Sequence, residues 1–96
     1  SRLATASETA FDALSHEIMA ETAAALGRAG DNAARAMARL HACEKDASER
    51  PVLLKEAVRA VHAWFIQREI CGLRRHQDVI RELRIPQEVL VRLGAS

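Results

Sequence analysis

The sequence predicts an all-α fold in which a long N-terminal helix forms an antiparallel hairpin with a second helix, followed by two short C-terminal helices. Two observations favour it: an apolar line with helical spacing runs through the first half of the chain, and a short polar linker separates it from a second helical pattern. No segment shows the alternation typical of a strand. Ninety-six residues, 49% of them hydrophobic and 28% charged, are typical of a single globular domain over residues 1–96.

The long helix is expected over residues 8–45. At about 100° per residue, its apolar line stays within one sector of a helical wheel. The line consists of Phe11, Leu14, Ile18, Thr22, Ala25, Ala29, Ala33, Ala36, Leu40 and Cys43. Gly27 and Gly30 lie off this line, and each costs a helix about 1 kcal/mol relative to alanine. Because the line resumes in phase at Ala33, we expect a continuous helix whose glycines face solvent or admit another backbone.

The second helix is expected over residues 51–71, after a polar linker that ends at Pro51. It has apolar residues on two faces, which indicates that both sides of the helix pack against other parts of the protein or a partner. One stripe contains Leu54, Ala57, Val58, Val61, Trp64 and Phe65, and Ile66 and Ile70 lie nearly opposite it. Arg68 falls inside the main stripe. Because an unpaired buried guanidinium is costly, Arg68 should extend to solvent or meet a carboxylate.

Two short helices are expected over residues 74–84 and 86–94, the second opened by Pro86. A helix from residue 9 to residue 44 is about 50 Å long, whereas a helix over residues 51–70 is about 30 Å long. The second helix therefore covers only the C-terminal half of the first. The half around Phe11 must be covered by the short helices or by a partner chain.

Charge and motif content exclude several classes of function. A net charge of +1 from 14 basic and 13 acidic residues gives no general attraction to nucleic acid or membrane. With no signal peptide or spanning segment recognised, we expect a cytoplasmic protein without membrane association. Cys43 and Cys71 are expected to be reduced structural thiols. Because the four histidines lack metal-ligand spacing and no phosphate loop is present, we expect no metal, no cofactor and no enzymatic activity.

The alternative function is DNA binding by a helix-turn-helix over residues 73–93. Its apolar core positions would be Val79, Leu83, Ile85, Leu90 and Leu93. The turn position usually held by glycine is Arg84, and the reading helix offers a single cation, so nucleic acid is disfavoured as a partner. The candidate DNA contacts are Arg74, Arg75, Arg84, Gln87 and Arg92.

Residues 63–73, Ala-Trp-Phe-Ile-Gln-Arg-Glu-Ile-Cys-Gly-Leu, together with Ile85-Pro86 and Leu93-Gly94, resemble a family of short all-helical bacterial proteins of unknown function. The segment Leu-Gly-Arg-Ala-Gly at residues 26–30 extends the resemblance over most of the chain. The resemblance implies no activity. If its hallmark is Gln-Arg-Glu-x-Cys-Gly-Leu, Arg68 and Glu69 become a candidate charge pair, for which a structural salt bridge is the favoured role.

We therefore expect a structural or protein-interaction module that acts as a homodimer. The alanine-rich long helix and the two-faced second helix leave apolar surface that a second copy would cover. An unidentified protein is the other possible partner.

Overall fold

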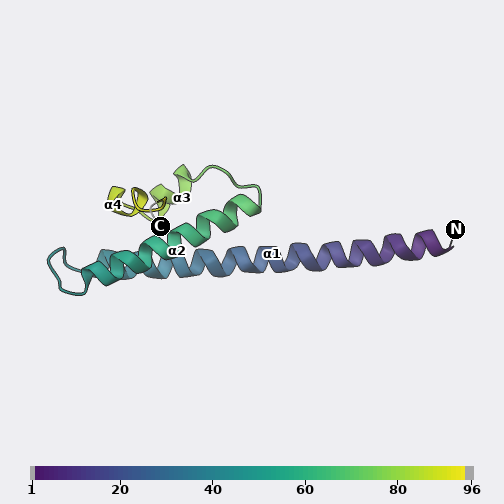
Figure 1. Cartoon of the computed structure of the whole chain (residues 1–96), viewed down its shortest axis with the longest axis horizontal. Helices are drawn as coiled ribbons and strands as arrows, with labels where there is room; N and C mark the ends of the chain where they lie inside the picture. Colours follow the sequence, from purple (N-terminus) through teal and green to yellow (C-terminus); the bar gives the residue numbers. More distant parts are fainter. Residues whose placement is uncertain (1, 95–96) are drawn as a thin grey trace.

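The computed structural model describes residues 2–94, with side chains described from Thr5 onward. Four helices follow one another: α1 (Arg2–Ala42), α2 (Arg50–Ile70), α3 (Gln77–Glu82) and α4 (Gln87–Leu90). Figure 1 shows α1 as a long, nearly straight rod, with α2 folded back along its C-terminal half and the short helices lying on α2. Residues 2–94 contain no strand, which confirms the all-α fold and the pairing of the long helix with the second.

Helix α1 runs without a break through both glycines, as the phase of the apolar line predicted. A β-carbon at Gly27 would meet nothing within 4 Å, whereas one at Gly30 would lie 3.1 Å from Nε1 of Trp64. Gly30 therefore admits a large side chain rather than another backbone. The helix also begins earlier than expected, because the Thr9 hydroxyl donates to the Thr5 carbonyl within the helix, 2.9 Å away, instead of capping its start.

The core lies between the C-terminal half of α1, α2 and the short helices. Its buried residues are Ala33, Ala36, Met37, Leu40, Leu54, Ala57, Val61, Phe65, Val79, Ile85 and Val89. The three alanines lie on the facing sides of α1 and α2, where small side chains let two helices approach closely. Pro51 occupies the first turn of α2, where its missing N–H breaks no helical hydrogen bond.

Both C-terminal helices are shorter than predicted. Helix α3 begins at Gln77 rather than at residue 74, because Gly72 at φ 87° turns the chain and the next residues run outside any helix. Helix α3 ends at Glu82, and two residues later the chain turns at Arg84, which has a left-handed backbone at φ 51°. Helix α4 is a single turn followed by further turns over residues 91–94, instead of a helix over 86–94.

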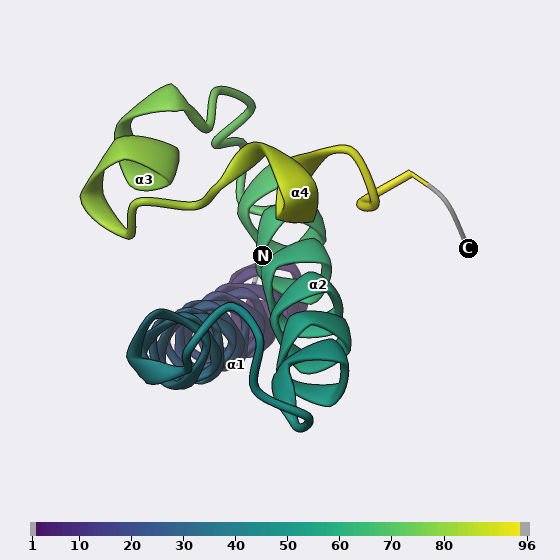
Figure 2. The same cartoon turned by 90° about the vertical axis from the view of Figure 1, so that its left-hand side faces the viewer.

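The N-terminal part of α1 stands apart from the other described helices (Figures 1 and 2). Figure 1 shows that α2 ends above the middle of α1, and in the end-on view of Figure 2 α4 lies over α2 while α3 lies on the side of α1. The sequence left two possibilities for the region around Phe11: burial under the short helices or burial by a partner chain. The first of these is therefore wrong. The radius of gyration is 18.5 Å, whereas a compact chain of this length would have about 12.5 Å.

Candidate functional site

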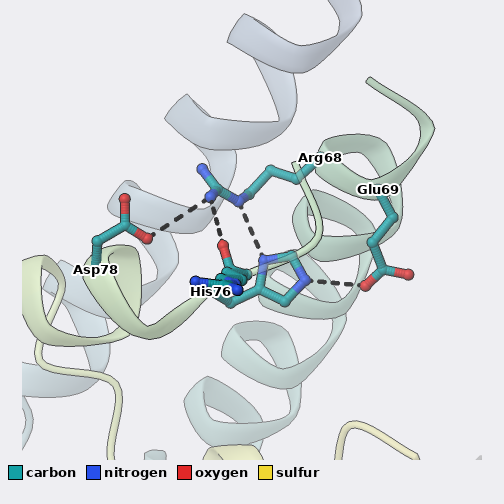
Figure 3. Close-up of polar contacts among 5 residues, drawn as sticks. Arg68, Glu69, His76 and Asp78 are labelled. Atoms are coloured by element: carbon teal, nitrogen blue, oxygen red, sulfur yellow. Dashed lines mark hydrogen bonds and ion pairs between the residues drawn. The ribbon is translucent and has the colours of Figure 1, made fainter. Parts of the chain in front are cut away.

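Arg68 and Glu69, the predicted charge pair, meet through His76 (Figure 3). Arg68 Nε lies 3.1 Å from His76 Nδ1, and His76 Nε2 lies 2.9 Å from Glu69 Oε2. Because the arginine nitrogen can only donate, Nδ1 accepts, which assigns the imidazole proton to Nε2. A neutral His76 therefore donates to the Glu69 carboxylate while it accepts from the Arg68 guanidinium.

The Arg68 side chain is only 11% exposed and makes three further contacts. Its Nη2 donates to the Arg75 carbonyl at 2.9 Å and lies 3.7 Å from Asp78 Oδ1. Its guanidinium carbon lies 5.6 Å from the centre of the Trp64 ring. The Asp78 side chain is 77% exposed. Arg68 thus neither extends freely into solvent nor meets a buried carboxylate; it holds the segment before α3 against α2.

The ring of His76 is held from three sides, by Arg68, Glu69 and Phe65. The imidazole stacks on Phe65, with ring centres 4.0 Å apart and planes within 7°. Both ring nitrogens are engaged, Nδ1 by Arg68 and Nε2 by Glu69, so the ring is fixed in orientation. The sequence singled out Arg68 and Glu69 but not His76, which is brought to them by the turn at Gly72.

A shallow groove of about 600 Å³ opens beside this cluster. Four arginines line it: Arg68, Arg74, Arg75 and Arg81. Two of the candidate DNA contacts, Arg74 and Arg75, are therefore brought together, whereas Arg84, Gln87 and Arg92 do not line this groove. Helix α4, which would read DNA in the alternative function, is about 6 Å long, far shorter than the recognition helices that lie in a major groove.

A second polar contact fixes α4 to the start of α2. Arg50 Nη1 donates to Glu88 Oε2 at 3.1 Å, and Nη2 pairs with the other carboxylate oxygen. The hydrogen bond from Arg50 holds the pKa of Glu88 below its ordinary value, with Arg92 and Lys45 acting in the same direction. The same bond raises the pKa of Arg50. This bidentate pair is therefore a structural clamp.

The two cysteines are free thiols in the structure. The pKa of Cys43 is raised, mainly by partial burial and to a smaller extent by the nearby Glu49 carboxylate. This thiol is therefore a poor nucleophile at neutral pH. Among the described residues, no three histidine, cysteine or acidic side chains are grouped to hold a metal ion. In the same part of the chain, no helix combines the length and apolarity needed to span a membrane.

The most conspicuous surface feature lies on residues 5–18, which we call the free half of α1. Phe11, Leu14 and Ile18 are 68%, 54% and 57% exposed. Each has a counterpart eleven and twenty-two residues later on the apolar line, in the sets 11/22/33, 14/25/36 and 18/29/40. An eleven-residue repeat gives about 3.67 residues per turn, so the line stays on one side of a nearly straight helix. The face that α2 covers at Ala33 and Ala36 is thus bare on the free half.

This bare face leads into a groove of about 440 Å³ between α1 and α2, which we call the alanine groove. Its lining residues are Ala25, Arg28, Ala29, Asn32, Glu56, Arg59, Ala60 and Ala63. Ile66 and Ile70 follow Ala63 at spacings of three and four, and both are exposed. Helical spacing therefore extends the apolar wall of the groove along α2 to these residues. The sequence marked Ile66 and Ile70 as a second face of this helix but did not indicate the groove.

The model of a family of unknown function (DUF6665) matches residues 4–96. The chain belongs to this family. The match confirms the expected membership in a family of unknown function, and the helical fold expected with it is the one observed. Neither the comparison with curated proteins nor that with solved structures finds a match. Membership in DUF6665 assigns no activity to the chain.

Proposed function

We propose that this chain is a protein-interaction module that assembles as a homodimer through the free half of α1. The proposal rests on one observation: the apolar face of α1 is buried along one part of the helix and exposed along another. The apolar line is buried where α2 lies on it, at Ala33 and Ala36, and bare from Phe11 to Ile18. A contiguous apolar face on a helix without a neighbour is typical of an interaction surface.

The total surface of the chain supports the same proposal. The chain exposes 7076 Å², whereas a compact monomer of 10.6 kDa exposes about 5500 Å². The excess of roughly 1600 Å² is larger than the 800 Å² or so that each partner contributes to a standard interface. The surplus surface is thus large enough for one interface of standard size without any rearrangement of the core.

The expected affinity follows from the side chains that would be covered. Burying Phe11, Leu14 and Ile18 in both copies contributes about 2 kcal/mol per side chain, or about 12 kcal/mol in total. Association costs about 4–15 kcal/mol in lost freedom of motion. Because the free energy gained by burial and the free energy lost on association are of similar size, dimerisation should be measured over a wide range of protein concentration, from about 1 to 100 μM.

The test is the molar mass from sedimentation equilibrium, with Ile18→Glu as the disrupting variant. We expect the wild-type mass to approach twice 10.6 kDa and the variant to remain a monomer. Ile18 is exposed and is not one of the buried core residues, so the substitution leaves the folded core untouched. Val91→Glu is the matched control, because Val91 is also an exposed apolar residue but lies beyond α4. A wild-type monomer throughout the range would refute the proposal.

DNA binding is a second candidate, favoured by the groove lined with four arginines. With so short an α4, such binding would act on phosphates rather than read bases. Fluorescence anisotropy of a labelled duplex over a salt series tests it. Affinity that falls steeply with salt and is reduced in an Arg74→Glu/Arg75→Glu variant would support this function. Flat anisotropy up to 100 μM protein would exclude it.

A further inference from the structure

We infer that the free half of α1 is covered by a second copy that runs antiparallel to it, centred on Ile18, and places its Phe11 at the alanine groove. The inference rests on the proposed homodimer and adds the direction, the register and the residues in contact.

Side-chain size along the apolar line favours the antiparallel direction. The large residues Phe11, Leu14 and Ile18 come first, and the small residues Thr22, Ala25 and Ala29 follow. In an antiparallel pair centred on Ile18, each residue faces the one equally far beyond Ile18 in the second copy. Phe11 then faces Ala25, Leu14 faces Thr22, and the two Ile18 side chains meet. A parallel pair would instead set large against large and small against small, which packs poorly.

The position of the alanine groove fits the same register. Ala25, the residue opposite Phe11, forms part of the groove wall together with Ala29 and the α2 residues Ala60 and Ala63. A benzyl side chain that enters there is surrounded by apolar atoms of two helices. Without an occupant, the α1–α2 pair leaves this space open beside an otherwise buried interface.

Charge also favours an antiparallel copy. Residues 3–27 contain four acidic residues and no lysine or arginine. A parallel, in-register pair would set each acidic residue level with its own copy, whereas the antiparallel register sets Asp12, Glu17 and Glu21 level with uncharged residues. The antiparallel register brings Glu8 level with Arg28 and close to Arg59, both of which line the alanine groove. Arg28 binds Glu21 at 3.0 Å, whereas Arg59 has no ion-pair partner among the described residues. Glu8 of a second copy would supply that partner.

The register is tested by oxidative cross-linking in a Cys43→Ser/Cys71→Ser chain, which removes the two native thiols. We expect Ile18→Cys to form a disulfide with itself, because the two copies meet at this residue. Phe11→Cys alone should cross-link poorly, but a mixture of Phe11→Cys and Ala25→Cys chains should form the mixed disulfide. Self-cross-linking of Phe11→Cys as fast as that of Ile18→Cys would overturn the antiparallel register.

The charge contact is tested by reversal and rescue. Glu8→Arg and Arg59→Glu should each weaken the dimer by at least fivefold in Kd, and the double variant should recover most of that loss, because the reversed pair restores the attraction. If the double variant dimerised as weakly as expected from adding the two single-variant losses in affinity, the contact between Glu8 and Arg59 would be refuted. The outcomes separate the two proposals: a monomeric wild-type chain refutes the homodimer, whereas a dimer with a different cross-linking pattern refutes only the register.

Discussion

Replacing Arg68 with methionine tests how the segment before α3 is held on α2. Methionine keeps the apolar stem that packs inside the helix stripe but removes every donor. The hydrogen bonds lost are those to His76 Nδ1 and to the Arg75 carbonyl, along with the 3.7 Å ion pair to Asp78. The structure allows each loss to be weighed separately.

The hydrogen bond to His76 carries most of the expected effect. A hydrogen bond to a charged group contributes about 1.5–3 kcal/mol, and the partner left behind is half-buried against Phe65. Arg75 is exposed, so water replaces the lost donor at its carbonyl. The Asp78 pair, with an exposed carboxylate, contributes about 0–1 kcal/mol. We therefore expect Arg68→Met to lower the free energy of unfolding by about 2 kcal/mol, which for a chain of this size lowers Tm by roughly 8–16 °C.

Urea unfolding followed by far-UV circular dichroism measures this difference, with all variants at one protein concentration because dimerisation would shift the apparent stability. Asp78→Asn is the control and should stay within about 1 kcal/mol of wild type. If Arg68→Met were equally neutral, the guanidinium would not be holding the segment. If Asp78→Asn matched Arg68→Met, the ion pair rather than the histidine contact would be responsible.

Two further predictions concern the glycines of α1 and the clamp on α4. Gly27→Ala should stabilise the protein by up to about 1 kcal/mol, since a β-carbon there meets nothing within 4 Å. Gly30→Ala should give no such gain, because the Trp64 ring would have to shift. Equal gains for the two variants in urea unfolding would contradict the close approach of Trp64 to Gly30. Glu88→Gln should lower Tm at pH 7. The pKa of Glu88 is lower in the folded state than in the unfolded chain. The carboxylate therefore contributes fully to stability above the unfolded-state pKa of about 4.3, and this contribution is lost as the pH falls through the folded-state pKa. The Tm difference between wild type and Glu88→Gln should therefore shrink below about pH 4.3, and a difference that stayed constant to pH 2 would argue against the clamp.

The long-range architecture could be predicted from the sequence because it depends on periodicity and length. The phase of the apolar line across Gly27 and Gly30 predicted one helix, and Pro51 marked the first turn of the next. The relative lengths of the two helices predicted that the region around Phe11 would lie beyond the reach of α2. The ends of the short helices were not predictable in this way, because α3 starts late owing to the left-handed turn at Gly72 and to contacts from another helix.

The candidate polar site was predictable only in part. A charge inside an apolar stripe identified Arg68, since such a residue must find a partner. The partner, His76, lies eight residues further along the chain, and its position depends on the intervening turn rather than on helical spacing. The alanine groove likewise depends on the pairing of two helices, so neither helix alone reveals it.

The polar contacts also explain why the short helices leave the free half of α1 bare. Arg50 and Glu88 hold α4 at the N-terminal end of α2, and Arg68 with His76 holds the start of the α3 segment at its C-terminal end. Between these two points Val79, Ile85 and Val89 are already buried in the core. Covering Phe11 and Ile18 with this segment would break both contacts and expose those three residues. A second chain can cover the same face without that loss, which is the physical reason for favouring association over internal folding.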